Sequence, residues 1–125
     1  MTASADSLVA LARRWLACFE RADLEGLLAL YAEDAVHTSP KIRVLHPATG
    51  GRLVGKAALR AWWQDAFARL PGLRYEETAL TPAADGSRVF MEYLRHAPGE
   101  ADLPVAEALD VGADGRIVAS RVFHG

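Results

Sequence analysis

The chain has 125 residues, of which 51% are hydrophobic and 24% charged, a composition typical of one soluble globular domain. Its net charge of -2 gives no reason to expect nucleic acid or an anionic membrane as a partner. The single cysteine, Cys18, excludes an intrachain disulfide and fits a reducing compartment. No apolar run approaches the ~20 residues that cross a bilayer, and the first residues lack a secretory signal. We therefore expect one cytoplasmic domain over residues 1–125.

Two helices are predicted at the start of the chain. The first is capped by Ser4 or Asp6 and runs to about Arg21, because its apolar residues follow the i, i+3, i+4 spacing of one helical face. Trp15 falls at the centre of that apolar stripe. Asp23 is typical of the N-cap of a second, short helix, which we expect to include Tyr31.

A strand and a third helix follow. Alternating side chains predict a strand over residues 35–39, with His37 and Ser39 on the same face. Residues 41–54 are expected to form a hairpin or a long loop, which could cover a pocket. The third helix is predicted over residues 56–70, preceded by a glycine and stopped by Pro-Gly.

The rest of the chain predicts a meander of short strands separated by Asp-Gly and Pro-Gly turns. The expected strands are Leu73 to Thr81, Arg88 to His96, Leu103 to Val111 and Arg116 to Phe123. Helices followed by such a meander indicate an α+β fold, with helices on one face of a mostly antiparallel sheet.

Glu107 is the residue that most suggests a function. In the hairpin of residues 104–125, one strand face carries Val105, Glu107, Leu109 and Val111 in alternation. A carboxylate inside an apolar row must face a cavity, be paired or be protonated, because burying it bare costs several kcal/mol or more. The sequence therefore predicts a pocket with Glu107 in its wall. The alternative is a satisfied polar core group that accepts a tryptophan N–H or pairs with a histidine.

Three stretches of the chain resemble segments of nuclear transport factor 2-like domains, and their spacing is consistent with that family. They are RADLEGLLALYAEDAV, GRLVGKAALRAWW and LDVGADGRIVASRVF. The resemblance covers nearly the whole chain. It implies a cone-shaped α+β barrel, a curved sheet packed on three N-terminal helices around a pocket. The superfamily includes isomerases, cyclases, dehydratases, hydrolases and non-catalytic binding modules, so the resemblance by itself does not define a reaction.

The chain is most similar to the SnoaL-like and ketosteroid isomerase-like branch, whose site can be compared residue by residue. The resemblance places the protonated acid of that branch at Glu107 and its general base at Ser39. The oxyanion tyrosine falls at Trp15, and the supporting tyrosines fall at Tyr31, retained, and at Trp63, replaced. An indole offers only an N–H donor and no ionisable hydroxyl. Steroid isomerisation by the usual mechanism is therefore not expected.

The same comparison with the ketosteroid isomerase-like branch implies further pocket residues. On the strand at 88–96 it turns Phe90, Glu92 and Leu94 inward and leaves Val89, Met91 and Tyr93 on the outer face. On the last strand it turns inward the residues Val118, Ser120, Val122 and His124. Glu92 would raise the pKa of Glu107 further, although a solvated Glu92 is the alternative.

Two functions remain open. The first is a cofactor-free acid–base enzyme, an isomerase, cyclase or dehydratase, acting on a small apolar carbonyl or hydroxyl compound. Glu107 and a neutral His37 would be its catalytic pair. The second is a non-catalytic ligand-binding or association domain, in which His37 only bonds to the backbone. The sequence shows no metal-ligand spacing or nucleotide-binding motif. We also expect a homodimer through the outer sheet face, formed by Val89, Met91 and Tyr93.

Overall fold

The structure is a computed structural model, and it describes residues 3–124. The predicted α+β organisation is confirmed. In chain order the elements are α1 (Ala5–Arg21), α2 (Leu24–Ala29), β1 (Tyr31–Thr38), α3 (Pro40–Leu45), the 3-10 turn η1 (Pro47–Thr49), β2 (Arg52–Val54), α4 (Lys56–Arg69), β3 (Arg74–Pro82), β4 (Arg88–His96), β5 (Leu103–Val111) and β6 (Ile117–Phe123).

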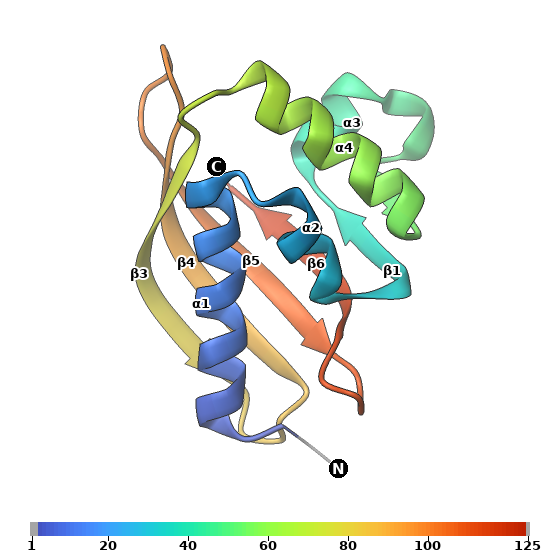
Figure 1. The fold of residues 1–125 in the computed structure, drawn as a ribbon, viewed down its shortest axis with the longest axis vertical. Coiled ribbons are helices and arrows are strands. Elements are labelled where there is room, and N and C mark those ends of the chain that lie inside the picture. The colour runs from blue at the N-terminus through green and yellow to red at the C-terminus, as the bar shows by residue number, and fades with distance from the viewer. Residues whose placement is uncertain (1–2, 125) are drawn as a thin grey trace.

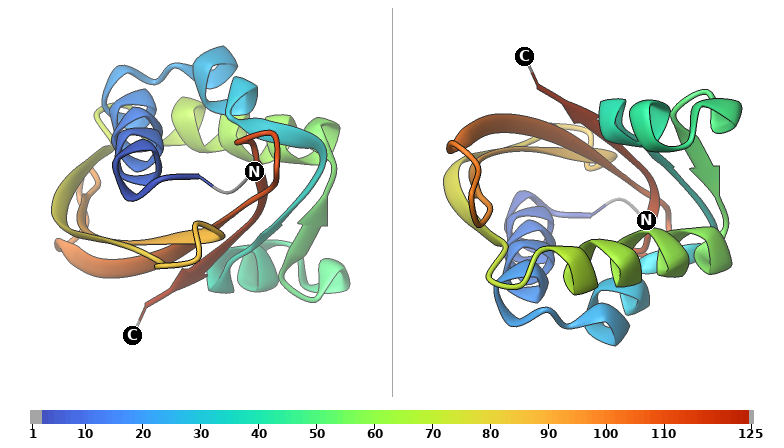
Figure 2. Two further views of the ribbon diagram at one scale, coloured as in Figure 1. Left: turned by 90° about the horizontal axis from the view of Figure 1, so that it is seen from below. Right: turned by 90° about the horizontal axis from the view of Figure 1, so that it is seen from above.

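The strands form one curved, mostly antiparallel sheet in the order β2-β1-β6-β5-β4-β3, with β1 and β6 parallel (Figure 1). The sheet does not close, because β2 and β3 remain its two edges. Figure 2 shows the curvature, with α1 in the hollow and α4 across its open side. The expected cone is thus an unclosed curved sheet completed by helices.

The hollow of the sheet holds the core. Helix α1 packs on β3 and β4, and α4 packs on β1 and β2. Trp15 and Phe19 of α1 meet an aromatic stack from the sheet, in which the rings of Tyr75 and Tyr93 lie 4.4 Å apart between centroids. Such rings bury a large area, and their paired contacts add to stability. In residues 3–124, no helix is long and apolar enough to cross a membrane.

The helix caps follow from local sequence, as predicted. The Ser4 hydroxyl accepts from the Ser7 N–H at the start of α1, and the Asp23 carboxylate accepts from the Gly26 N–H at the start of α2. Each cap satisfies a backbone donor that would otherwise have no partner in the first helical turn.

Two predicted segments differ from the structure. Tyr31 begins β1 rather than lying in α2, because the Leu30 carbonyl accepts from Ile117 N–H at 2.9 Å and the chain joins the sheet there. Residues 41–54 are not a hairpin or a structureless loop. Ser39 caps the short helix α3, in which Pro40 occupies the first turn, and the segment continues through η1 into strand β2.

The predicted faces of β4 are reversed. Met91 pairs with Glu107 and Tyr93 pairs with Val105 in the antiparallel ladder. Residues directly opposite each other project to the same face of a sheet, so Met91 and Tyr93 share the inner face with Glu107. Both are buried, whereas Phe90 is 37% exposed. The inward placement of Phe90, Glu92 and Leu94 was wrong, as was the outward placement of Val89, Met91 and Tyr93.

Candidate functional site

A cavity of about 410 Å³ lies between the hollow of the sheet and helices α1, α3 and α4. This volume is in the ordinary range for small-molecule sites. The predicted site residues that line it are Trp15, His37, Ser39, Trp63, Glu107 and His124. Tyr31 and Ser120 lie behind this lining and are fully buried. Phe90 and Glu92 belong to the other face of the sheet and do not line the cavity.

Glu107 is a buried acid with one free oxygen. It lies in the middle of β5, and the alternation of that strand directs it inward, as predicted. Its Oε1 accepts a hydrogen bond from the Tyr93 hydroxyl at 2.8 Å, while its buried Oε2 has no partner within residues 3–124. The alternative partners, a tryptophan N–H or a histidine, are not the ones observed.

Burial raises the pKa of Glu107 to about 8, against the smaller lowering effect of the Tyr93 hydrogen bond. Desolvation alone therefore accounts for the direction, and Glu92 is not needed. At neutral pH the group is mostly protonated. Because Tyr93 already donates to Oε1, the proton belongs on Oε2, and Glu107 presents a neutral hydrogen-bond donor.

A chain of buried hydrogen bonds leads to His37. The Trp15 indole N–H donates to the Tyr31 hydroxyl at 3.0 Å, and Tyr31 donates to Ser120 Oγ at 2.9 Å. Ser120 Oγ lies 2.6 Å from His37 Nδ1. The last contact arises because His37 of β1 and Ser120 of β6 are direct neighbours in the parallel ladder.

The direction of the protons along this chain follows from both of its ends. An indole N–H can only donate, so the Tyr31 hydroxyl accepts from Trp15 and gives its own proton to Ser120. Among the described residues, His37 Nδ1 is the remaining hydrogen-bond partner of Ser120 Oγ, so the Ser120 proton goes to His37 Nδ1. We therefore assign the proton of His37 to Nε2, from donor accounting. Burial lowers the pKa of His37 to about 4, so the ring is neutral at pH 7.

The other predicted residues have simpler surroundings. Ser39 Oγ accepts from the Lys41 backbone N–H at 3.2 Å as the cap of α3. Trp63 forms a wall of the cavity, with its ring centroid 5.1 Å from that of His37. His124 lines the cavity near its mouth, and burial lowers its pKa.

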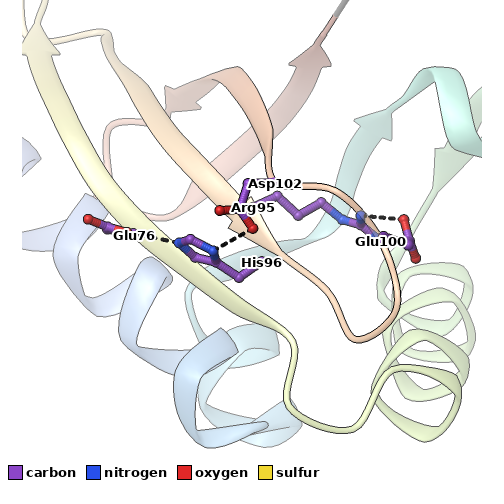
Figure 3. Close-up of polar contacts among 5 residues, drawn as sticks. All are labelled: Glu76, Arg95, His96, Glu100 and Asp102. Carbon is purple, nitrogen blue, oxygen red and sulfur yellow. Dashed lines mark hydrogen bonds and ion pairs between the residues drawn. The ribbon is translucent and has the colours of Figure 1, made fainter.

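Several cavity residues were missed by the sequence reasoning. Tyr93, which bonds Glu107, and Arg95 share the inner face of β4, so the register with β5 was the missing signal. Lys41 was assigned to a loop, whereas α3 places it at the mouth of the cavity. Arg95 donates from Nη1 to Glu100 Oε1 at 2.9 Å. Figure 3 shows these two side chains directed toward each other, with the neighbouring His96 directed away.

This arrangement defines a class of protein, a curved-sheet domain whose helices close a mainly apolar pocket around a protonated acid. The family profile of SnoaL-like domains matches residues 12–120, so the chain belongs to the SnoaL-like family. The resemblance to nuclear transport factor 2-like domains is confirmed. A comparison with curated proteins finds no match.

Solved structures share the fold. A SnoaL-like protein of unknown function from Burkholderia thailandensis is 26% identical, covering 100% of this chain and 99% of its own, with a TM-score of 0.88. TerC, co-crystallised with polyporic acid, is 20% identical over 95% of this chain and 92% of its own, with a TM-score of 0.79. A protein with a ketosteroid isomerase-like fold from Catenulispora acidiphila, in complex with trimethylamine, is 19% identical over 92% and 85% of the two chains, with a TM-score of 0.72.

Proposed function

We propose that this protein binds a small, largely apolar carbonyl or hydroxyl compound in its cavity and acts on it as a cofactor-free acid–base enzyme. Glu107 is the acid that donates to the oxygen of the bound compound. His37 supplies a second neutral donor through Nε2. Isomerisation, aldol-type cyclisation and dehydration all suit such a site, because each passes through an oxygen that gains negative charge and is stabilised by fixed donors. The proton that carbon loses in these reactions goes to water in the cavity, because Glu107 and His37 both act as donors.

One observation carries this proposal. Glu107 Oε2 is buried and has no hydrogen-bond partner among residues 3–124, in the wall of a cavity large enough for a ligand. Burial raises the pKa of Glu107 to about 8, so the group is mostly protonated at neutral pH. A buried donor without a partner is costly in free energy, so it is rarely kept for stability alone. A pKa of about 8 also lies close to neutral pH, where a proton donor and its conjugate base are both accessible.

The identities of the walls support the chemical class. Trp15, Phe19, Trp63 and Tyr75 present aromatic surface to the cavity, which favours a flat or hydrophobic compound. The solved relatives that hold polyporic acid and trimethylamine are consistent with small-molecule binding in this fold, and they support the proposal only at that level.

A second function, ligand binding without catalysis, is favoured by one specific feature. Ser39, at the position where the ketosteroid isomerase branch carries its base, is engaged as the cap of α3. The proton assigned to His37 Nε2 makes that ring a donor rather than a base. A site with two donors can hold and orient a carbonyl compound without moving any proton.

Glu107→Gln separates the two functions. Glutamine keeps the shape and a donor but cannot release a proton, so we expect turnover of enolisable ketones to fall by about 100-fold or more, as general acid catalysis implies. Ligand-induced melting shifts should change much less. Glu92→Gln is the matched control, because that exposed carboxylate lies on the opposite face of the same sheet. Unchanged turnover in Glu107→Gln would contradict the catalytic role, and binding with no turnover in the unmodified protein would establish the second function.

We also propose a homodimer through the outer sheet face, formed by different residues from those that the sequence predicted. Val89, Met91 and Tyr93 are inside the protein and cannot form an interface. The outer face instead exposes the stacked rings of Phe90 and Phe123, 6.3 Å apart between centroids. Phe123 is 51% exposed, and an apolar patch of this kind often marks an interaction surface.

A further inference from the structure

The cavity has two chemically different ends. Its inner end holds Glu107 and His37 among aromatic rings. Its mouth is formed where α3, the end of α4 and the end of β4 meet, and it is lined by three cationic side chains, Lys41, Arg69 and Arg95. The cations come from three separate elements, so only the tertiary fold brings them together.

The mouth contains more positive than negative charge. Among residues 3–124, the only carboxylate in the lining besides Glu107 is Glu100, which bonds Arg95. Arg69 is exposed and bonds Asp65 on its own helix, with 2.7 Å between Nε and Oδ2. Lys41 makes no ion pair within 4 Å in the part of the chain that the structure describes, although Glu100 attracts it at longer range. One positive charge at the mouth, that of Lys41, therefore has no direct partner among the residues that the structure describes.

Arg95 adds to the evidence for excess positive charge at the mouth, because its side chain is buried, with only 6% of the residue exposed. A buried guanidinium carries five N–H donors, and Glu100 occupies one nitrogen, Nη1. Burial lowers the pKa of Lys41, and repulsion by the neighbouring charges of Arg95 and Arg69 lowers it further, against the attraction of Glu100. An anion at the mouth would relieve that repulsion.

We infer that the ligand of this cavity carries a carboxylate at one end and a carbonyl or hydroxyl oxygen at the other. The carboxylate lies at Lys41 and Arg95, and the oxygen lies at Glu107. The oxygen end of this inference rests on the proposed function, whereas the carboxylate end rests on the mouth alone. A carboxylate suits the site because it accepts two hydrogen bonds from one guanidinium in a fixed geometry.

The strand register gives the length of such a ligand. Glu107 is opposite Met91, and Arg95 lies four residues further along β4. At the usual rise per residue the two levels are separated by roughly 13 Å. The proposed ligand therefore has an apolar body of about two fused or linked rings between its polar ends. Its class is an aromatic or alicyclic keto acid or hydroxy acid.

The test uses a rigid probe of this length, biphenyl with an acetyl group at one end and a carboxylate at the other. Its methyl ester removes the charge, and a version with ethyl in place of acetyl removes the carbonyl. Binding is measured by isothermal titration calorimetry. We expect the acid to bind the unmodified protein about tenfold tighter than the ester, as one or two charge-assisted hydrogen bonds imply.

Two variants test the residues. Lys41→Gln should remove most of the preference for the acid and leave ester binding unchanged. Glu100→Gln should tighten binding of the acid, because it removes the competing carboxylate from Arg95. Added salt should weaken binding of the acid probe and leave binding of the ester unchanged. Equal affinities of acid and ester for the unmodified protein, or an acid that does not bind at millimolar concentration, would overturn the inference.

The same probes separate this inference from the proposed function. Suppose that the ethyl compound binds as tightly as the acetyl compound and that Glu107→Gln has no effect on either. The carbonyl contact with Glu107 is then wrong, while a retained preference for acid over ester still supports the carboxylate site. The reverse result, a carbonyl effect without an acid effect, would support only the proposed function.

Discussion

Tyr93 on β4 donates a hydrogen bond to Glu107 on β5 at 2.8 Å, and this contact limits how far burial raises the pKa of the carboxyl group. The bond stabilises the ionised form and so lowers a pKa that burial has raised. Removing the hydroxyl in Tyr93→Phe is expected to move the pKa of Glu107 above its value of about 8. The carboxyl resonance of Glu107, followed by NMR across pH, measures the shift. Tyr75→Phe is the control, because Tyr75 stacks on Tyr93 without bonding Glu107, and an equal shift in both variants would contradict the assignment.

Stability should depend on pH through Glu107 and His37 in opposite directions. The pKa of Glu107 rises from 4.5 to about 8 on folding. Its contribution to the free energy of unfolding is therefore complete below pH 4.5 and is lost as the pH rises to 8. The pKa of His37 falls from 6.5 to about 4, so its contribution is full above pH 6.5 and is lost as the pH falls to 4. The two slopes oppose each other between pH 4.5 and 6.5. A net loss of about 2 kcal/mol is expected between pH 6.5 and 8.

Chemical denaturation at several pH values checks this profile. Glu107→Gln should abolish the loss above pH 6.5 and leave a rise between pH 4 and 6.5. The exposed His96, whose pKa is raised by Glu76 and Asp102, contributes equally to both proteins and cancels in the difference. A profile for Glu107→Gln that runs parallel to that of the unmodified protein would refute the buried, protonated acid.

The tautomer of His37 follows from Trp15 and can be observed directly. Nitrogen NMR of labelled histidine distinguishes a proton on Nε2 from one on Nδ1, and we expect Nε2 in the unmodified protein. In Trp15→Phe the Tyr31 hydroxyl is no longer forced to donate to Ser120, so the Nδ1 form should become populated. The same change should cost about 1–3 kcal/mol of stability through lost packing and a lost hydrogen bond.

Trp63→Phe is the matched control for that experiment. Trp63 also contacts His37, with 5.1 Å between ring centroids, but it lies outside the hydrogen-bond chain. The Trp63→Phe substitution should destabilise the protein without changing the tautomer of His37. Finding the proton on Nδ1 in the unmodified protein would show that the donor accounting is incorrect.

The proposed dimer makes a separate prediction. Phe123→Gln and Phe90→Gln replace the stacked pair on the outer sheet face with polar groups, and each should shift the protein toward a monomer. Sedimentation velocity at micromolar concentration measures the mass. Val44→Gln is the control, because Val44 is 77% exposed on α3 and belongs to no part of that face. A monomeric mass for the unmodified protein would exclude the dimer.

Gly26 is required by its cap. A Cβ at Gly26 would overlap the Asp23 carboxylate that caps α2, so Gly26→Ala should not give the gain of about 1 kcal/mol usual for this change within a helix. Asp23→Ala alone should cost about 1 kcal/mol. In the Asp23→Ala background the Gly26→Ala change should become stabilising, because the clash is gone. Thermal denaturation of the four proteins measures this coupling, and additive effects would contradict it.

What the sequence predicted was local. The caps at Ser4 and Asp23 each depend on a residue three positions away, and the inward direction of Glu107 depends only on alternation along its own strand. The family resemblance then supplied the arrangement of helices around the sheet, which the SnoaL-like match confirms.

What the sequence could not predict depended on register between distant segments. Both faces of β4 carry large apolar residues, so alternation alone does not distinguish Met91 from Phe90, and only pairing with β5 does. The bond between His37 and Ser120 joins residues 83 positions apart. The charged mouth was missed for a different, local reason, since Lys41 lies on a short helix that has too few residues to show a helical period.

The open sheet leaves the cavity with one wall that is independent of strand pairing. Strands β2 and β3 are the two edges of the sheet and do not pair, and side chains of α3 and α4, such as Leu45 and Trp62, contribute to the lining of the cavity. Exchanging those side chains alters the shape of the chamber while every backbone ladder stays intact. In such a scaffold, ligand selectivity can change with little loss in the free energy of unfolding. Helices α3 and α4 are therefore the natural elements to mutate in order to change which ligand the protein binds.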